Sequence, residues 1–330
     1  MKGAFIRQTG SPDVIQIGEL PIPEPAIGQV RIRVHAASVN PIDTYIRSGA
    51  VAMPLAFPFV IGCDFAGVVD SVGPQVEGFS AGDRVWGSNQ GLLGRQGTAA
   101  QYITVDSPWV YPLAEGVSFE SAAACALVGI TAHLGVFREA RLRSGETILV
   151  IGGTGGVGSM VVQMAKIAGA RVLATSSSQE KAARCRQLGA DAVMNYHCDD
   201  LRSFVQEHAP QGVDVFWETR REPDFETAFE LLGERGRMIL MAGREARPPF
   251  PVGPFYVKQC SLHGFVMFKA AASDQREAAE AIQRWLAEGR LQPQISRRMR
   301  LDQAAEAHRL QELSTVENRR ELAGKIVLEV

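Results

Sequence analysis

The segment between residues 147 and 169 constrains the fold of this chain most, because a strand there runs into glycines and then into a helix. Thr147–Ile151 is an apolar, β-branched run of strand length, and the glycine-rich segment Gly153–Gly158 follows it. Apolar residues recur at helical spacing from Val157 to Ala168, and Gly169 is placed to end the helix. This order predicts a pyrophosphate-binding turn, because a helix N-terminus presents free amide groups and a favourable dipole.

The individual glycines have distinct expected roles. The first of the pattern, Gly153, permits a tight turn, and the second, Gly155, lets a pyrophosphate approach the bare backbone. A six-residue glycine pattern alone is weakly specific, and the strand before it and the helix after it make it specific here. The residues expected to contact the ligand are Gly153, Thr154, Gly155, Gly156, Val157 and Gly158.

Size and charge exclude several functional classes. The 330 residues suggest about two domains of ordinary size. A net charge of −2 and the lack of a long basic run argue against a nucleic-acid partner. The longest uncharged run, Ser121–Phe137, is slightly too short to span a bilayer and is expected to form a buried helix, so we expect no membrane partner.

The cysteines and the N-terminus bear on localisation. The five cysteines are scattered, and none forms the Cys-x-x-Cys spacing of a zinc lobe or redox motif. Reduced thiols in the cytoplasm are the simplest explanation, and the first residues do not resemble an export signal.

The pattern of predicted secondary structure changes near residue 119. Before it, short strands alternate with turns, as in Val30, Ile32 and Val34, which alternate with polar residues. After it, strands alternate with helical patterns, which predicts a doubly wound, mostly parallel α/β sheet. The six expected strands are Thr147–Ile151, Arg171–Thr175, Ala192–Asn195, Val213–Trp217, Arg237–Met241 and Ser261–Val266. The last 60 residues predict helices around Ser273–Glu288 and Leu301–Glu312 and a final strand, Lys325–Val330.

Taken together, the chain resembles the zinc-independent, ζ-crystallin-like quinone oxidoreductases of the medium-chain dehydrogenase/reductase superfamily. The motifs that carry the resemblance are Val39–Gly49, Ile61–Gly67, Gly82–Val85, Gly129–Ala132, the glycine turn and Gly324–Val327. The resemblance implies a GroES-like β-barrel catalytic domain (1–120 and 266–330) and a Rossmann domain (121–265) with a six-stranded parallel sheet. It also implies an active site in the cleft between them and a homodimer joined by edge pairing of the sixth strand.

The zinc enzymes of the same superfamily provide a test for a metal. Aligned by motif, their catalytic ligand positions fall on Asn40–Asp43, on Cys63-Asp64 and near Val128, so only one thiol remains. Their structural zinc lobe would fall within 89–100, which contains no cysteine. We therefore expect no zinc, and we expect Cys63 to be a buried, inert thiol.

The end of the second strand of the α/β region favours NADPH over NADH. Ser176 stands where NAD-dependent enzymes usually have a carboxylate, and Ser177 follows it. The resemblance implies that Lys181, Tyr196 and Arg320 also contact the 2′-phosphate of NADPH. It further places Thr131 near the nicotinamide or the substrate. Gly243 and Phe265 lie at the ends of the fifth and sixth strands, which face the ligand crevice in this fold, and main-chain contacts to the nicotinamide are expected there.

Some of these positions also have purely structural explanations. Ser177 with Glu180 forms a capping-box pattern, which would leave Lys181 as a solvated helix residue. Asn40 precedes a proline and stands three residues before Asp43, which is the pattern of a helix N-cap and a first-turn acid. Asn40 has both interpretations.

Without a metal, hydride transfer to an already electrophilic acceptor is the natural reaction, and a quinone or an α,β-unsaturated carbonyl fits. The resemblance places the expected catalytic residues, Asn40 and Tyr45, near the nicotinamide or the substrate. The Tyr45 phenol can share a proton with the acceptor oxygen, or its ring can form a wall of the pocket. His133 lies within an apolar run without a nearby acid and is expected to be a buried imidazole rather than a base.

The turn Glu218–Pro223 departs from the small, glycine-containing turn common in the family. One hypothesis is that Arg220 or Arg221 selects an anionic acceptor, and the alternative is that both pair with the neighbouring glutamates. At the level of the whole protein, the alternatives are a non-enzymatic NADPH-binding protein, as in crystallin-like or RNA-binding relatives, and a zinc-type alcohol dehydrogenase.

Overall fold

The computed structural model describes residues 1–316, 319 and 322–330. These residues form two compact units, called here unit 1 (1–128 with 271–330) and unit 2 (129–270). Arg320, one of the expected cofactor contacts, lies outside the described residues.

Unit 1 is built on an antiparallel core around one long strand, β3 (Gln29–Val39). Val30, Ile32 and Val34 are buried, as their alternation predicts, and β3 pairs with β5, β7 and β16. The other strands are β1 (Lys2–Ile6), β2 (Gln16–Glu19), β4 (Phe59–Val60), β5 (Asp64–Val72), β6 (Arg84–Gly87), β7 (Tyr102–Asp106), β8 (Val110–Pro112), β15 (Ile295–Arg300) and β16 (Lys325–Glu329). The helices are α1 (Pro41–Ser48), α8 (Ala272–Ala287) and α9 (Ala304–Thr315).

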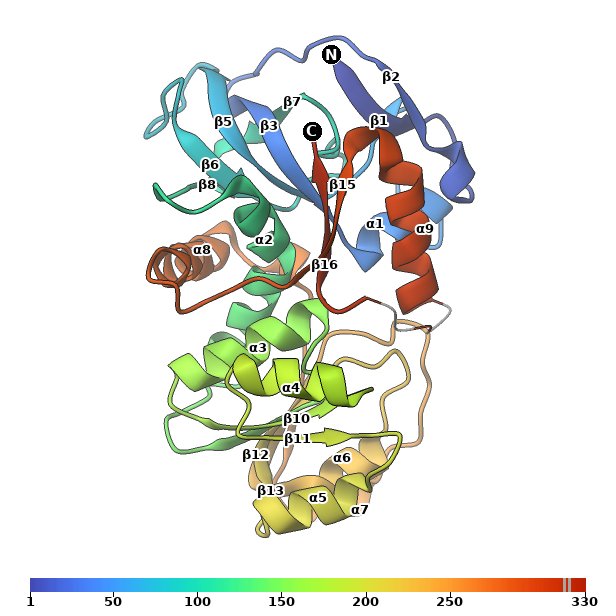
Figure 1. Cartoon of the computed structure of the whole chain (residues 1–330), viewed down its shortest axis with the longest axis vertical. Coiled ribbons are helices and arrows are strands. Elements are labelled where there is room, and N and C mark those ends of the chain that lie inside the picture. Colours follow the sequence, from blue (N-terminus) through green and yellow to red (C-terminus); the bar gives the residue numbers. More distant parts are fainter. Residues whose placement is uncertain (317–318, 320–321) are drawn as a thin grey trace. The chain divides into compact units, whose positions relative to one another are not determined.

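Unit 2 is a doubly wound sheet. In the described part of the chain it has six parallel strands in the order β11-β10-β9-β12-β13-β14, which confirms the predicted sheet. The strands are β9 (Thr147–Val150), β10 (Arg171–Ser176), β11 (Ala192–Asn195), β12 (Val213–Glu218), β13 (Leu232–Leu240) and β14 (Ser261–Gly264). The helices are α3 (Gly156–Ile167), α4 (Gln179–Gln187), α5 (Leu201–His208), α6 (Phe225–Leu231) and α7 (Val252–Val257). Figure 1 shows α3 and α4 on one face of this sheet and α5 and α6 on the other.

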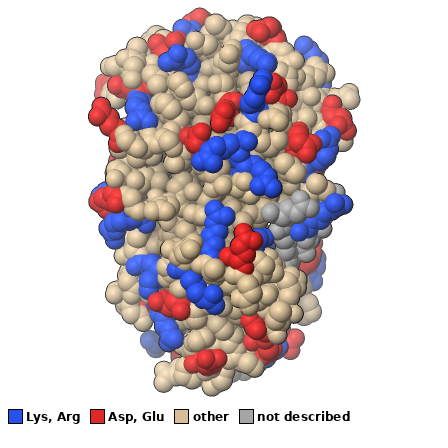
Figure 2. Space-filling view, viewed as in Figure 1, with Lys and Arg blue, Asp and Glu red and all other residues tan. Residues whose placement is uncertain are grey.

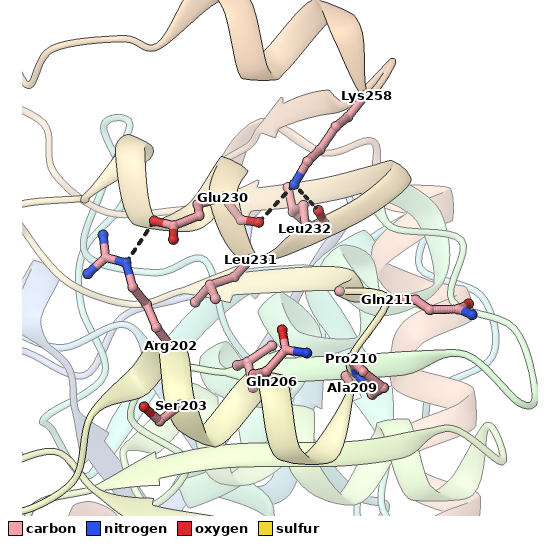
Figure 3. Close-up of a pocket in the computed structure, with 12 residues that line it drawn as sticks. Arg202, Ser203, Gln206, Ala209, Pro210, Gln211, Glu230, Leu231, Leu232 and Lys258 are labelled. Carbon is pink, nitrogen blue, oxygen red and sulfur yellow. Dashed lines mark hydrogen bonds and ion pairs between the residues drawn. The ribbon is translucent and has the colours of Figure 1, made fainter.

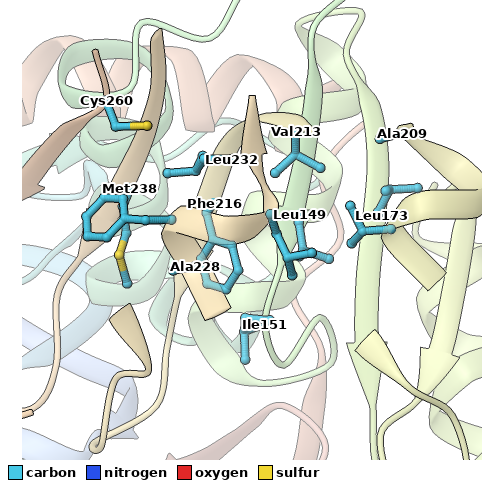
Figure 4. Packing of buried hydrophobic residues seen from close by; sticks show 13 residues of the cluster. Leu149, Ile151, Leu173, Ala209, Val213, Phe216, Ala228, Leu232, Met238 and Cys260 are labelled. Carbon is cyan, nitrogen blue, oxygen red and sulfur yellow. The ribbon is translucent and has the colours of Figure 1, made fainter. Parts of the chain in front are cut away.

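Apolar side chains from the central strands hold the sheet to its helices. Leu149, Leu173 and Phe216 are fully buried and share one cluster with Val213 and Met238 (Figure 4). Continuous apolar strands are expected where helices cover both faces of a parallel sheet. This packing fixes the carboxyl ends of β9 and β12, where the candidate site begins.

The apolar run near residue 121 forms a helix, as predicted. Helix α2 (Phe119–His133) continues into a π-helical turn, Leu134–Glu139. Among the described residues, Phe119–Glu139 is the one helix that could cross a membrane by length and composition, and 78% of its most apolar window is buried. A mostly buried helix of this kind is what a protein core contains.

Charged side chains of both signs are interspersed on the face of the molecule shown in Figure 2. No broad field of one sign is visible there, in keeping with the net charge of −2. Interspersed charges give no extended patch for a polyanion on this face.

Candidate functional site

The turn after β9 has the geometry of an anion-binding loop, with one difference from the prediction. The left-handed residue is Gly152, with a φ of +76°, and not Gly153. A Cβ on Gly153 would instead lie 2.6 Å from the sulfur of Cys185 and 2.9 Å from the Cβ of Ala174. Gly153 is therefore required by close packing, and the expected role of a turn glycine belongs to its neighbour.

The first turn of α3 fits a phosphate group. Its N-cap is Gly155, so no side chain caps the first amide groups, and the first intrahelical bond runs from the Ser159 amide to the Gly155 carbonyl at 2.9 Å. Unsatisfied amides and the helix dipole both favour an anion at this position. A Cβ on Gly155 would make an ordinary 3.4 Å contact with the Gly152 oxygen, whereas one on Gly158 would lie only 2.2 Å from that atom.

The residues expected at the adenosine ribose gather at the ends of β10 and β11. Ser176 is 2% exposed, and its hydroxyl shares its one proton between the carbonyls of Ser178 and Met194, each at 3.3 Å. The Tyr196 amide donates to the Ser176 carbonyl at 3.1 Å. The Ser176 hydroxyl is thus hydrogen-bonded to the backbone, and the pairing of β10 with β11 places Tyr196 beside Ser176.

Helix α4 is capped by Ser178, so the predicted capping box of Ser177 with Glu180 is wrong. The Ser178 hydroxyl accepts a hydrogen bond from the Lys181 amide at 3.2 Å. Ser178 has the extended backbone of an N-cap residue (φ −159°, ψ 162°). Ser177 and Lys181 are both half-buried at this strand end and helix start.

Three further predicted contacts lie in unit 2. Thr131 is buried in α2, and Gly243 follows β13 with a φ of +87°. Phe265 follows β14, and its ring lies edge-on to Trp217 with 6.5 Å between ring centres. Gly243 and Phe265 follow the carboxyl ends of parallel strands, the edge where open α/β sheets bind ligands.

Unit 1 contains a buried polar network centred on Asp64, which is 0% exposed. Its carboxylate accepts hydrogen bonds from the Ser38 hydroxyl, the Asn40 amide nitrogen and the Ser88 hydroxyl, at 2.7 to 2.8 Å. The Leu127 backbone amide donates a fourth bond at 3.1 Å. A buried carboxylate needs such partners, because burial otherwise carries the full desolvation cost.

Lys325 supplies the positive charge of this network. Its ammonium group donates to the side-chain oxygen of Asn40 and, at 2.9 Å, to the Val39 carbonyl, and it lies 3.7 Å from Asp64. Asn40 is 0% exposed, with its amide shared between Asp64 and Lys325. The catalytic role of Asn40 stays a prediction, and its contacts in this structure are with the network.

Asp43 behaves as the first-turn acid that the sequence predicts. Its carboxylate accepts a hydrogen bond from the Asn40 backbone amide at 2.8 Å, at the start of α1. Burial raises the pKa of Asp43 to about 7, against the opposing effect of the Cys63 thiol, and the Asp64 charge raises it further. Burial and the charge of Asp43 also raise the pKa of Cys63, so this thiol is protonated at neutral pH.

We predict that Asp43 makes stability fall with rising pH. Because its pKa is higher in the folded state than the ordinary 3.8, its contribution is complete below about pH 4 and is lost as the pH rises through about 7. The total is on the order of 4 kcal/mol. Urea unfolding at each pH should show Asp43→Asn gaining on the wild type over this range.

The matched control is Asp13→Asn, since the Asp13 side chain is 76% exposed. Burial lowers the pKa of His133 to about 4 and that of His308 to about 3, so both destabilise the fold as the pH falls below about 6.5. This opposite trend cancels in the comparison of variant with wild type. A difference that does not change between pH 4 and 7 would contradict the prediction.

Tyr45 and His133, two other residues discussed from the sequence, differ in burial. Tyr45 is half-buried on α1, where its neighbours Thr44 and Ile46 are buried. His133 is buried with its ring 4.7 Å from that of Phe137, and its lowered pKa keeps it neutral at pH 7. His133 is therefore a buried imidazole, as predicted.

A surface pocket in unit 2 lies elsewhere (Figure 3). It is lined by α5, the residues between α5 and β12, the end of α6 and the start of β13, with the Arg202–Glu230 ion pair at its side. The Lys258 ammonium donates to the carbonyls of Glu230 and Leu232, both at 2.8 Å. This is the amino-terminal edge of the strands, opposite to the glycine turn, and it is not the candidate site.

Comparison with known proteins agrees with this architecture. Residues 26–115 match the model of the alcohol dehydrogenase GroES-like domain, and residues 156–285 match that of the zinc-binding dehydrogenases. The mouse quinone oxidoreductase is 32% identical over 93% of both chains. The chain therefore belongs to the quinone oxidoreductases of the medium-chain dehydrogenase/reductase superfamily.

Solved structures share the whole fold. A crystal structure of an NAD-dependent alcohol dehydrogenase has a TM-score of 0.90 at 32% identity, over all of both chains. The Escherichia coli quinone oxidoreductase complexed with NADPH has a TM-score of 0.86 at 25% identity, again over all of both chains. The GroES-like and Rossmann folds expected from the sequence are thus confirmed.

One of the matching families is described as zinc-binding, but the residues at the aligned ligand positions of this chain do not form a zinc site. Cys63 is buried and is the one cysteine at the aligned ligand positions, whereas a catalytic zinc needs three protein ligands. Asp64 is already bonded to four donors, with the Lys325 ammonium close by. No group of three His, Cys, Asp or Glu residues that could hold a metal ion occurs within residues 1–316, 319 and 322–330. These residues do not fit a zinc ion.

Sequence reasoning missed two features of this site. Lys325 was noted only as part of a family motif. The sequence gives no sign of its contact with Asp64, which lies more than 250 residues away in the chain. Glu218, at the end of β12, pairs with Arg220 as the alternative interpretation of this turn expected, but its burial, at 0% exposure, was not predicted. A charged residue that directly follows an apolar strand is the signal that could have identified Glu218 as buried.

Proposed function

We propose that this chain is an NADPH-dependent oxidoreductase that transfers a hydride to a quinone or an α,β-unsaturated carbonyl without a metal ion. The observation that carries the proposal is the uncapped first turn of α3, at the carboxyl end of β9, in a chain of the quinone oxidoreductase family. Unit 2 would hold the cofactor, and unit 1 would supply the predicted catalytic residues.

When bound, NADPH supplies the hydride. The amides of Gly156 and Val157 would bind its diphosphate, because they lie in the first turn of α3, which no side chain caps. At the end of β10, Ser176 takes the position where a carboxylate would repel a 2′-phosphate, and Lys181 and Tyr196 lie nearby in the chain. The Escherichia coli enzyme with NADPH supports the same choice of cofactor.

The metal-free part of the proposal is supported by the network in unit 1. Lys325 donates to Asn40 and lies close to Asp64, whose charge opposes the lowering of the Lys325 pKa by burial, so the buried acid already has a compensating partner. Acceptors that are electrophilic by themselves need no Lewis acid to polarise a carbonyl, and quinones and enones belong to this class. Tyr45, whose phenol is both donor and weak acid, would pass a proton to the acceptor oxygen or line the acceptor pocket.

The test is an acceptor panel measured with both NADPH and NADH. We expect turnover of 9,10-phenanthrenequinone and simple enones with NADPH, and weaker or no turnover with NADH. A parallel panel of primary and secondary alcohols with NAD⁺ tests the activity named for one structural neighbour. Preferred oxidation of an alcohol with NAD⁺ would reject the proposal, as would binding of NADPH without turnover of any acceptor.

Lys181→Ala is predicted to reduce the preference for NADPH. Loss of one charged contact to a phosphate should weaken NADPH binding about tenfold and leave NADH binding nearly unchanged. Calorimetry with both cofactors measures this, and Lys269→Ala, at an exposed lysine of the same unit, is the control. Equal losses for the two cofactors would show that Lys181 does not contact the 2′-phosphate.

We also propose a homodimer formed through β14. This strand is the edge of the sheet in unit 2, and Val252, Tyr256 and Val257 on the preceding helix are 62 to 66% exposed. An open strand edge beside exposed apolar side chains favours pairing with a second copy. Val257→Asp should lower the mass measured by light scattering to that of one chain, and an unchanged mass would exclude this interface.

The proposed function also indicates the partners and the location of the protein. The partner is a small-molecule quinone or enone, with no nucleic acid or membrane. A cytoplasmic location is supported by Cys63, Cys125, Cys185, Cys198 and Cys260, all of which are free thiols.

A further inference from the structure

The turn after β12 holds a buried ion pair at the edge of the sheet. Glu218 is 0% exposed, and Arg220 donates to its carboxylate through the backbone amide at 2.8 Å, through Nε at 3.0 Å and through Nη2 at 2.6 Å. The Arg220 side chain is 35% exposed. One arginine side chain is thus clamped by a carboxylate that water does not reach.

This ion pair lies beside the glycine turn. The Thr219 hydroxyl donates to the Ile151 carbonyl at 2.7 Å, and a Cβ on Gly152 would lie 3.0 Å from that hydroxyl. On the other side, a Cβ on Gly243 would lie 2.8 Å from the Arg221 carbonyl oxygen. The neighbours of Arg220 therefore contact the glycine turn on one side and Gly243, an expected cofactor contact, on the other.

The strand order tells which half of a dinucleotide Arg220 would meet. Strand β9, which leads into the glycine turn, lies between β10 and β12. A dinucleotide that crosses the turn places its adenosine half over β10, where Ser176 ends the strand, and its nicotinamide half on the side of β12. Arg220 follows β12 and so belongs to the nicotinamide side.

The ion pair leaves Arg220 able to bind an anion. Its contacts with Glu218 use Nε and Nη2, so Nη1 takes no part in the ion pair. Burial lowers the pKa of Arg220, but the hydrogen bonds and charge of Glu218 and the charge of Asp224 raise it overall, so the guanidinium stays charged. A planar guanidinium held on one edge by a carboxylate presents a preoriented donor to a phosphate oxygen.

We propose that Arg220 binds the nicotinamide-side phosphate of NADPH and that Glu218 is the positioning residue that orients it. The proposal rests on the proposed NADPH-dependent function. It replaces the hypothesis that this turn selects an anionic acceptor, and it gives the departure from the small family turn a role in cofactor binding.

The test compares binding of three ligands by calorimetry: NADPH, reduced nicotinamide mononucleotide and 2′,5′-ADP. Arg220→Gln should weaken NADPH and the mononucleotide about 10- to 100-fold and leave 2′,5′-ADP, which lacks the nicotinamide half, unchanged. Arg220→Lys should restore part of the loss, because it keeps the charge without the planar fork. Arg221→Gln is the matched control at the neighbouring position and should bind all three ligands as the wild type does.

A second variant addresses folding, because Arg220→Gln leaves the Glu218 carboxylate buried without its partner. Glu218→Gln/Arg220→Gln removes both charges together and should show the same selective loss of NADPH and mononucleotide. Unchanged NADPH affinity in this double variant would overturn the proposal, as would an equal loss of 2′,5′-ADP.

Two further outcomes are distinguishable. A raised KM for anionic acceptors alone, with NADPH affinity intact, would assign Arg220 to the acceptor and overturn the proposal. Failure of the proposed function would appear differently, as an unsubstituted protein that does not bind NADPH.

Discussion

Gly158→Ala is expected to abolish NADPH binding and to destabilise unit 2. The new methyl group would lie 2.2 Å from the Gly152 carbonyl oxygen and 3.0 Å from its carbon, so the helix start must move away from the turn. Both contacts are with backbone atoms, and a rotamer change cannot relieve them. Overpacking of this kind costs about 1–3 kcal/mol. The shift also misplaces the first-turn amides, so we expect at least about a 100-fold loss of NADPH affinity.

Gly155→Ala is the matched control, because its Cβ would be 3.4 Å from the same oxygen, an ordinary contact. This variant should unfold at the wild-type midpoint, yet it should bind NADPH more weakly, since the methyl group covers the backbone that the diphosphate approaches. Thermal unfolding without ligand and calorimetry with NADPH separate the two effects. Wild-type NADPH affinity in Gly158→Ala would contradict the assignment of this turn as the diphosphate site.

Lys325→Met is expected to cost about 3–5 kcal/mol of folding stability, which is the usual effect of removing one partner from a buried ionic network. The substitution leaves the Asp64 carboxylate buried without a nearby cation and takes a donor from the side-chain oxygen of Asn40. Methionine keeps a similar apolar length, so the loss reports the ammonium group rather than a cavity. The midpoint of urea unfolding measures the change.

Two further variants make this result specific. Lys325→Met/Asp64→Asn removes both charges and should recover much of the lost stability, because the acid no longer needs compensation. Lys269→Met, at an exposed lysine, should change the midpoint little. If Lys325→Met unfolded at the wild-type midpoint, Lys325 would not be the cation that compensates Asp64.

The sequence predicted the fold well where apolar periodicity decides it. Strand β11 has the predicted bounds, Ala192–Asn195, and β9 begins at the predicted residue, Thr147. Gly169, with a φ of +81°, follows the end of α3 as expected. The strand was predicted to start at Arg237, but β13 starts at Leu232. The glycines and charged residues that follow Leu232 are typical of a turn. Leu232 nonetheless pairs with Val213 across a register shift, and Arg235 takes a left-handed φ of +59° within the strand.

The candidate site could be predicted only in part, for a different reason. The glycine turn is local in sequence, so its pattern identifies it, although the tight turn falls on Gly152 rather than Gly153. The choice of cap between Ser177 and Ser178 depends on backbone angles that three consecutive serines do not reveal. The Asp64–Lys325 contact depends on which strands pair, since β16 lies against β3. A single sequence does not contain that information.

The central claim is tested most directly by turnover in the absence of metal. Protein dialysed against a strong chelator and shown by elemental analysis to hold no stoichiometric metal is mixed with NADPH and 9,10-phenanthrenequinone, and the loss of nicotinamide absorbance is followed. We predict full activity that added zinc does not raise. Activity that disappears on chelation and returns with one zinc per chain would contradict this account, as would NADPH binding with no oxidation at all.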